Sequence, residues 1–273
     1  MKLSLVLSTH AAQFAAVAFK GDFEANVAKI AGWGYDGVEL AIRDPRLVDG
    51  AELERVVSAH ELVVPAIGTG QAWGEEGLSF TDPDPAVRAA AIERTISHIP
   101  FAAQTGAIII IGLLRGIVKP GVSQEQAMDW LVESLQECCA EARSFGSAQD
   151  KPYGVRIALE PICRYETTLI NNAAQGLDLL ERVGADNMGL LLDTFHMNIE
   201  EPVIEESIRA CGDRIFHFHV ADSNRWYPGA GHLDFKSILD ALFATGYQGF
   251  VSGEFMPLPD ADTSAERSVA YLR

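Results

Sequence analysis

The chain has 273 residues, 48% of them hydrophobic, and its 38 acidic and 21 basic side chains give a net charge of −17. A negative field of this size repels phosphate backbones and anionic lipid headgroups, so we expect neither nucleic acid nor a membrane as a partner. The four cysteines show no zinc-binding spacing, which favours a reducing compartment without structural disulfides.

The N-terminal stretch MKLSLVLSTHAAQF resembles a signal peptide only briefly. Polar residues such as Ser8, Thr9 and His10 interrupt its apolar run early, and no run in the chain approaches the length of a membrane span. We therefore expect a first buried strand followed by a loop, in a cytoplasmic protein.

Short apolar runs predict eight β-strands. Runs that are apolar at nearly every position are typical of parallel strands covered on both faces. The predicted strands are 2–8, 36–41, 62–68, 107–112, 155–160, 188–193, 215–220 and 249–254.

Longer amphipathic segments between these runs predict eight helices. Ser123 is a suitable N-cap for one of them, and the stretches GWGYDG, GADN and TGYQG place a glycine where a helix would end in a left-handed cap. The predicted helices are 22–33, 51–60, 84–104, 123–144, 172–184, 202–211, 234–245 and 261–272.

The strict alternation of strand and helix predicts an α/β fold, a (β/α)₈ TIM barrel that forms a single domain over residues 1–273. An open doubly wound sheet is the alternative, but the first strand is not followed by a glycine-rich phosphate loop. The polar stretch 144–154 is predicted as a long loop. Trp130, on a predicted helix, belongs either to the core or to a contact between subunits, so a homo-oligomer stays open.

Acidic and imidazole side chains stand at the ends of four consecutive predicted strands: Glu160, Asp193, His219 and Glu254. In a TIM barrel these ends share one rim, where the active site lies. Converging carboxylates repel one another unless a cation neutralises them. Three oxygen ligands and one nitrogen suit one divalent metal ion such as Mn²⁺, Co²⁺ or Mg²⁺, and Zn²⁺ is also compatible.

Each of these residues also has a structural interpretation. Asp193 in DTFHMNIEE could simply cap a turn, Glu160 could pair with Arg164, and Glu254 could pair with a lysine. His217 and His219 lie on one face of the same predicted strand, and His219 is nearer the rim. We therefore expect His219 as the ligand and His217 as a hydrogen-bonded core histidine or a support for the ligands.

Other polar residues follow the strands toward the same rim. Trp73 could form a sugar-stacking wall or a lid contact. Arginines in four rim loops favour a substrate carboxylate, since arginine binds carboxylates in a bidentate manner. The additional candidates are Glu166, His196, Arg225, Arg115, Arg43 and Arg164.

Motifs across residues 18–259 resemble the xylose isomerase-like TIM-barrel superfamily of sugar isomerases and epimerases, and within it the ketose 3-epimerases. The similarity is greater still to 5-keto-L-gluconate epimerases of inositol catabolism. Cys163 and the stretch PGAGHLDF depart from the pattern of simple ketose epimerases, where asparagine and a basic loop are common. The motifs are AFKGD, GYDGVELAIRDP, AIGTGQAW, IIIGLLRG, RYETTLIN, DTFHMNIEE, HFHVADSNRWYPGAGHLDF and SGEFMPLP.

The resemblance implies one divalent metal held by Glu160, Asp193, His219 and Glu254, with the two glutamates as the acid–base pair. It also implies that Glu166, His196 and Arg225 contact the substrate. The expected reaction inverts C3 of a ketose or a keto-sugar acid, such as 5-keto-L-gluconate or D-tagaturonate, through an enediolate. From the rim arginines, we expect Arg115 or another of them to bind a substrate carboxylate, and we select Arg115 for the test.

Other functions on the same barrel are weighed against this expectation. A hydroxypyruvate isomerase or an inosose-processing enzyme would share the metal site. A non-catalytic sugar-binding barrel would not need both Glu160 and Glu254. An apurinic endonuclease would need several zinc ions and many histidines, whereas this chain has seven histidines and a strongly negative charge.

Overall fold

The computed structural model describes residues 1–11, 13–145 and 154–273, and these form the predicted (β/α)₈ barrel. Eight parallel strands follow one another around the barrel in chain order, and β1 closes the ring by pairing with β9. A two-residue strand, β2, pairs with β1 but is not one of the eight strands of the closed ring. The strands are β1 (Lys2–Ser8), β2 (Phe19–Lys20), β3 (Gly37–Ala41), β4 (Ala66–Gly68), β5 (Ile108–Ile111), β6 (Ile157–Leu159), β7 (Met188–Asp193), β8 (Ile215–Val220) and β9 (Phe250–Gly253).

Strand β5 shows why the strands are continuously apolar. Ile108 and Ile110 join a small cluster inside the barrel, whereas Ile109 and Ile111 join the large cluster that includes residues of the surrounding helices. Successive side chains of a strand point to opposite faces, so a strand covered on both faces needs apolar residues at every position.

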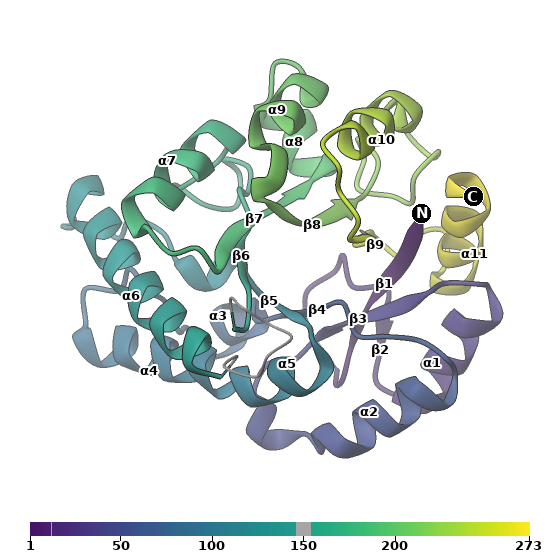
Figure 1. Cartoon of the computed structure of the whole chain (residues 1–273), viewed down its shortest axis with the longest axis horizontal. Helices are drawn as coiled ribbons and strands as arrows, with labels where there is room; N and C mark the ends of the chain where they lie inside the picture. Colours follow the sequence, from purple (N-terminus) through teal and green to yellow (C-terminus); the bar gives the residue numbers. More distant parts are fainter. Residues whose placement is uncertain (12, 146–153) are drawn as a thin grey trace.

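The helices form a ring around the strands (Figure 1). Ser123 caps α6 by accepting from the Gln126 backbone N–H, and Gly34, Gly184 and Gly246 adopt positive φ after their helices, as predicted. No helix among the described residues is long and apolar enough to cross a membrane. The helices are α1 (Phe23–Gly32), α2 (Gly50–Ala59), α3 (Gln71–Glu76), α4 (Pro85–Ser97), α5 (Ile99–Thr105), α6 (Gln124–Ser144), α7 (Ala173–Val183), α8 (Thr194–Glu200), α9 (Ile204–Cys211), α10 (Phe235–Ala244) and α11 (Ala261–Leu272), with single 3₁₀ turns at Pro45–Leu47, Leu113–Arg115 and Gly212–Arg214.

Two predicted elements are altered by proline. The predicted helix 84–104 is divided into α4 and α5 at His98, because Pro100 has no N–H to continue the helical ladder. The predicted strand 62–68 shortens to β4, which begins directly after Pro65. Val63, before this proline, retains an isolated bridge to Gly37.

Two short helices occupy loops that follow strands. Helix α3 follows β4 and carries Trp73, and α8 follows β7 and carries most of DTFHMNIEE. Both are too short for a clear helical periodicity in the sequence. Most of the predicted loop 144–154 lies outside the described residues, and Trp130 lies half-buried under the Arg88 guanidinium, 4.2 Å from its ring centroid.

Candidate active site

The four residues predicted as metal ligands converge at one end of the barrel. Glu160 directly follows β6, Asp193 ends β7, His219 belongs to β8, and Glu254 directly follows β9. One potential ligand atom from each lies within 4.8 Å of the others. The parallel strands carry them there, because their carboxyl ends share one rim.

Asp193 combines both interpretations considered for it. Its Oδ1 caps helix α8 by accepting from the Phe195 backbone N–H at 2.8 Å. Its Oδ2 is buried without a hydrogen-bond partner among the described residues. One carboxylate can therefore begin a helix and offer an oxygen to a cation.

Unpartnered buried atoms mark the centre of the cluster. Besides Asp193 Oδ2, Glu160 Oε1 and His219 Nδ1 have no partner in the described part of the chain. A buried polar atom without a partner is costly, and each of the three can offer a lone pair to a metal once the His219 ring is neutral. Burial lowers the pKa of His219, but Glu39 raises it to about 10, so a bound metal would displace a proton from this ring. The donor set therefore fits a hard or borderline divalent cation.

The shifted pKa values of the two glutamates also favour a cation in the cluster. Burial, followed by the nearby Glu254, raises the pKa of Glu160 well above its usual value. Burial likewise raises the pKa of Glu254 to about 7, although His219 and Arg225 oppose this shift. Carboxylates whose ionised forms are disfavoured in this way gain most from a cation placed among them.

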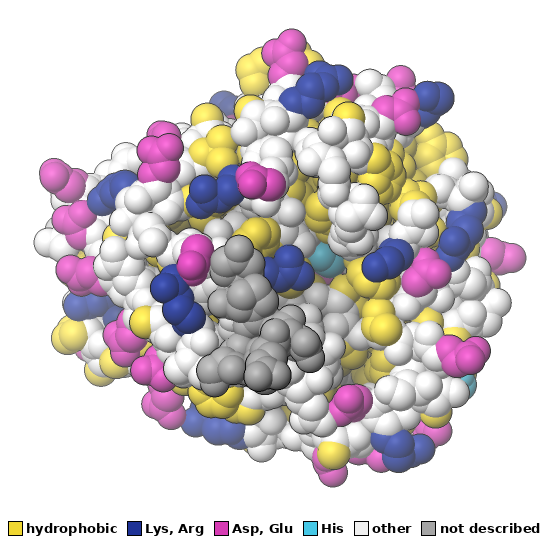
Figure 2. Space-filling model, viewed as in Figure 1, with side chains coloured by type: hydrophobic (Ala, Val, Ile, Leu, Met, Phe, Trp, Pro, Cys, Tyr) yellow, Lys and Arg dark blue, Asp and Glu magenta, His cyan; other side chains and the backbone are white. Residues whose placement is uncertain are grey.

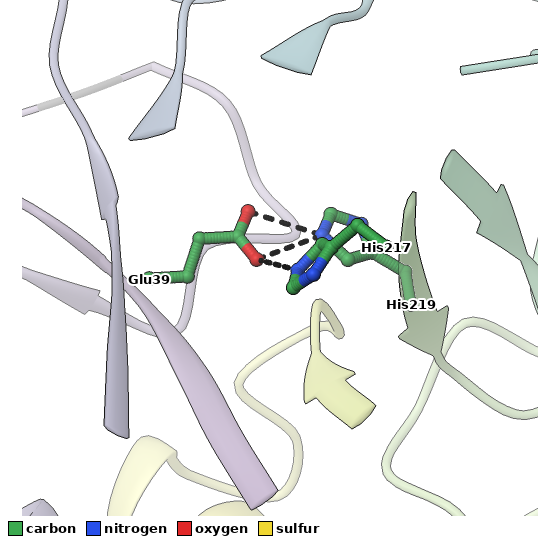
Figure 3. Close-up of side chains that lie close together, drawn as sticks. All are labelled: Glu39, His217 and His219. Atoms are coloured by element: carbon green, nitrogen blue, oxygen red, sulfur yellow. Dashed lines mark hydrogen bonds and ion pairs between the residues drawn. The ribbon is translucent and has the colours of Figure 1, made fainter. Parts of the chain in front are cut away.

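A buried carboxylate that we did not predict lies behind His219. The Nε2 atom of His219 is 3.0 Å from both oxygens of Glu39, and the Nε2 atom of His217 is 2.7 Å from Oε2 of the same residue (Figure 3). The expectation that His217 is a hydrogen-bonded core residue is confirmed. The one feature of the sequence that could have identified Glu39 is its position as an acidic residue in the middle of the buried run DGVELA.

A cavity of about 300 Å³ opens over the cluster. This volume is at the small end of the range for ligand pockets, and it suits a molecule the size of a monosaccharide. Acidic and basic side chains intermingle around the edge of the face shown in Figure 2, and a histidine is visible near its middle. The lining includes the predicted residues Glu160, Glu166, His196, His219, Arg225, Glu254 and Trp73.

Arg225 is held firmly in the wall of this cavity. It pairs with Glu166 at 2.6 Å and with Glu254 at 3.6 Å. Its guanidinium also lies over the rings of Phe14 and Phe195, at 5.2 and 4.7 Å from their centroids. Arg225 is therefore placed in the cavity wall, and its charge is already shared by two carboxylates.

His196 presents one defined nitrogen to the cavity region. Its Nδ1 accepts from the Cys163 backbone N–H at 3.4 Å, so a neutral ring carries its proton on Nε2. That Nε2 lies 3.8 Å from Glu160 Oε1. Burial, and then Arg225, hold the pKa of His196 well below its usual value, which keeps the ring neutral.

The other three arginines of the rim loops are held by partners in the protein. Arg115 is fully buried and donates to the backbone carbonyls of Gly112, Leu169 and Ile170. Arg43 pairs with Glu75 and Glu76, and Arg164 pairs with Glu200 rather than with Glu160. None of these three arginines is part of the described lining.

Comparisons with known proteins agree with this geometry. Residues 27–273 match the family model described as "Xylose isomerase-like TIM barrel". The chain is 31% identical to the L-ribulose 3-epimerase of Mesorhizobium japonicum, over 98% of this chain and 86% of that protein. It is 30% identical to the D-psicose 3-epimerase of Ruminiclostridium cellulolyticum, over 85% of this chain and 78% of that protein.

A solved structure shows the same similarity in three dimensions. The D-allulose 3-epimerase of Methylomonas sp., crystallised in complex with D-allulose, superposes with a TM-score of 0.82 at 25% identity, over 100% of this chain and 96% of that chain. The matched model, the relatives and the closed eight-stranded barrel together show that this chain is a member of the xylose isomerase-like TIM barrel family whose relatives are ketose 3-epimerases.

Proposed function

We propose that the protein is a divalent-metal-dependent epimerase that inverts C3 of a free ketose. The observation that carries this proposal is the placement of Glu160 and Glu254 beside the same cavity, in one cluster with Asp193 and His219. Inversion of a carbon next to a carbonyl needs one group to remove a proton and another to return a proton to the opposite face. The names of the relatives support the same reaction.

Glu160, Asp193, His219 and Glu254 would hold the metal ion. When bound, the ion would supply Lewis-acid polarisation of the ketose carbonyl, which makes the neighbouring C3–H more acidic. It would also balance carboxylates that otherwise repel one another.

Glu160 and Glu254 divide the proton transfer between them. They directly follow β6 and β9, with β7 and β8 between them in the barrel. A ketose in the cavity is therefore approached by carboxylates from two sides. We assign removal of the C3 proton to one of them and its return, on the opposite face, to the other.

Neighbouring side chains orient the substrate. The Nε2–H of His196 can donate to a substrate oxygen, since the other ring nitrogen already accepts from Cys163. Glu166 and Arg225 form a joined acceptor and donor pair in the same wall, which suits sugar hydroxyl groups.

The ion pairs favour a neutral ketose over the keto-sugar acid expected from the sequence. Arg225 already faces Glu166 and Glu254, and it is the one arginine in the described lining. Three ligand carboxylates exceed the charge of one divalent ion, so a substrate carboxylate would enter a negative site. The keto-sugar acid expected from the sequence is the alternative substrate, and Arg225 is the one arginine of the described lining that could meet its carboxylate.

Proton NMR in D₂O tests the reaction and its substrate together. Protein loaded with diamagnetic Mg²⁺ is given L-ribulose, D-psicose, 5-keto-L-gluconate or D-tagaturonate. Loss of the C3–H signal together with the appearance of the C3 epimer is expected, and faster with the neutral ketoses. Faster turnover of the acids would overturn the charge argument, and no exchange with any of them would exclude the epimerase.

Two variants and one control identify the catalytic groups. Glu160→Gln and Glu254→Gln keep the side-chain size but remove one of the two acid–base groups, so each is expected to abolish conversion to the C3 epimer. Glu141→Gln changes an exposed glutamate on the outer helix α6 and should leave the rate unchanged. Conversion at the wild-type rate in either site variant would contradict the assignment.

A further inference from the structure

We infer that Glu39 is a positioning residue that fixes the tautomer of His219, and that His217 in turn holds Glu39. The inference rests on the proposed metal centre and assigns it two residues outside the ligand set. Glu39, His217 and His219 are 1%, 1% and 2% exposed, so the contacts between them are shielded from water.

The direction of the hydrogen bonds follows from the chemistry of the partners. An ionised carboxylate can only accept, so each imidazole must present an N–H at its Nε2. An ionised Glu39 therefore accepts from both rings, whose Nε2 atoms lie 2.7 and 3.0 Å from its oxygens (Figure 3).

The consequence for His219 is a free lone pair on the other nitrogen. With the proton on Nε2, Nδ1 is unprotonated in the neutral ring, and this is the atom that has no partner and lies 3.9 Å from Glu254. A metal-binding histidine commonly donates its second N–H to a carboxylate, which orients the ring and increases its basicity.

His217 completes the arrangement from the other side. It lies two residues before His219 on β8, so both rings point into the barrel and meet the same carboxylate. The register between β7 and β8 shifts by one residue between Leu190 and Leu191, which leaves Phe216 without a partner in β7. Such a bulge redirects the residues after it, here toward the barrel interior.

A purely space-filling role for Glu39 is the competing explanation. Glu39 and His219 line the cavity of about 300 Å³ over the cluster, and His217 lines a second cavity of about 490 Å³. The group could therefore serve only to fill the barrel between these cavities. Glutamine has nearly the same shape as glutamate, so Glu39→Gln separates the two roles.

Glu39→Gln should change the tautomer of His219. His219 Nε2 is equally close to both carboxylate oxygens, so one ring would face the new amide NH₂ group. To accept from it, His219 must move its proton to Nδ1, the metal-facing atom. We expect metal affinity to fall by about 10- to 100-fold, the usual effect of losing such a partner.

The experiment measures Mn²⁺ affinity by calorimetry in the full-length protein, with thermal unfolding of the metal-free protein alongside. Glu39→Gln is expected to bind Mn²⁺ more weakly while its metal-free unfolding midpoint stays close to wild type. In the Zn²⁺-loaded protein, ¹⁵N NMR should show the His219 proton on Nε2 in the wild type. His217→Gln, which can still donate to Glu39, should retain more affinity than His217→Ala.

Ser4→Ala is the matched control, because Ser4 is a fully buried polar residue on β1 whose hydroxyl has no partner among the described residues. It should bind Mn²⁺ like the wild type. Wild-type affinity in Glu39→Gln, with the His219 tautomer unchanged, would overturn the inference and leave the epimerase proposal intact. A wild-type protein that binds no divalent ion would instead overturn the proposed function, and the inference with it.

Discussion

At the scale of single residues, several side chains of the site use one polar atom for a hydrogen bond within the protein and present the other to the cluster or the cavity. Asp193 uses one oxygen for the helix and leaves the other in the cluster, and His196 accepts through one nitrogen and offers a proton on the other. His219 is divided in the same way between Glu39 and the cluster. This division fixes one polar atom of each side chain and leaves the other for a ligand.

The two tasks of Asp193 can be separated by a pair of substitutions. Asparagine still caps a helix but is a much poorer metal ligand, whereas alanine does neither. We expect Asp193→Asn and Asp193→Ala both to lose metal binding, with the alanine variant less stable than the asparagine variant by about 1 kcal/mol. Calorimetric titration and urea unfolding measure the two effects. Equal stability of the two variants would contradict the capping role.

Gly112 sets the position of Glu160. A methyl group at Gly112 would lie 3.1 Å from Glu160 Oε2, so the carboxylate would have to shift by a few tenths of an ångström. Because Glu160 is a proposed acid–base group and small displacements of such a group are costly, we expect Gly112→Ala to lower kcat by about tenfold or more with a small effect on stability. Gly32→Ala, where the added methyl group meets nothing within 4 Å, is the control. Unchanged turnover in Gly112→Ala would show that Glu160 tolerates the shift.

At the scale of elements, short segments after the strands bring the site together. Helix α8 is attached to β8 through Thr194, whose hydroxyl donates to the Ala221 carbonyl and accepts from the Ala221 N–H. The loop after β8 is organised around the buried Asp222, which accepts from the backbone N–H groups of Ser223, Gly229 and Leu233. This loop carries Arg225, which adopts a φ of 61°.

Asp222 is therefore expected to matter for substrate binding without touching the substrate. In Asp222→Asn, an amide NH₂ group replaces one accepting oxygen, so at least one buried N–H loses its partner, at a cost of about 1–3 kcal/mol. The resulting freedom of Arg225 should raise KM more than it lowers kcat. Urea unfolding and steady-state kinetics test this, and a variant with normal stability and KM would refute the role of the loop.

At the scale of the whole molecule, the barrel closes where the two ends of the chain meet. Asp36 accepts from the Leu3 backbone N–H at 2.8 Å and from Arg273 at 2.9 Å, beside the pairing of β1 with β9. This closure brings Glu254, from the last strand, to the same site as Glu160. The active site therefore depends on the complete ring of strands.

Metal binding should consequently stabilise the whole fold. A ligand that binds only the folded state at a hundred times its Kd adds about 2.7 kcal/mol of stability. We expect Mn²⁺ at that excess to raise the unfolding midpoint by several degrees over protein treated with EDTA. Asp193→Asn should show no such gain. An equal gain in that variant would place the stabilising ion elsewhere.

Much of the architecture was determined by the sequence alone. The apolar runs at β1, β7 and β8 predicted those strands to the residue, and the alternation of strands and helices predicted the barrel. The convergence of the four candidate ligands was also predicted, because in a parallel barrel the ends of strands share one rim. These features follow from local patterns and a general rule of topology.

Other features were decided only by the tertiary structure. The partnership of Glu39 with two histidines spans 178 and 180 residues, and a bulge between β7 and β8 sets its geometry. The rim arginines looked available for a substrate carboxylate, yet Arg225 is paired with Glu166 and Arg115 is buried against backbone carbonyls. Pairing between distant residues depends on distances in the folded chain, and no periodicity in the sequence records those distances.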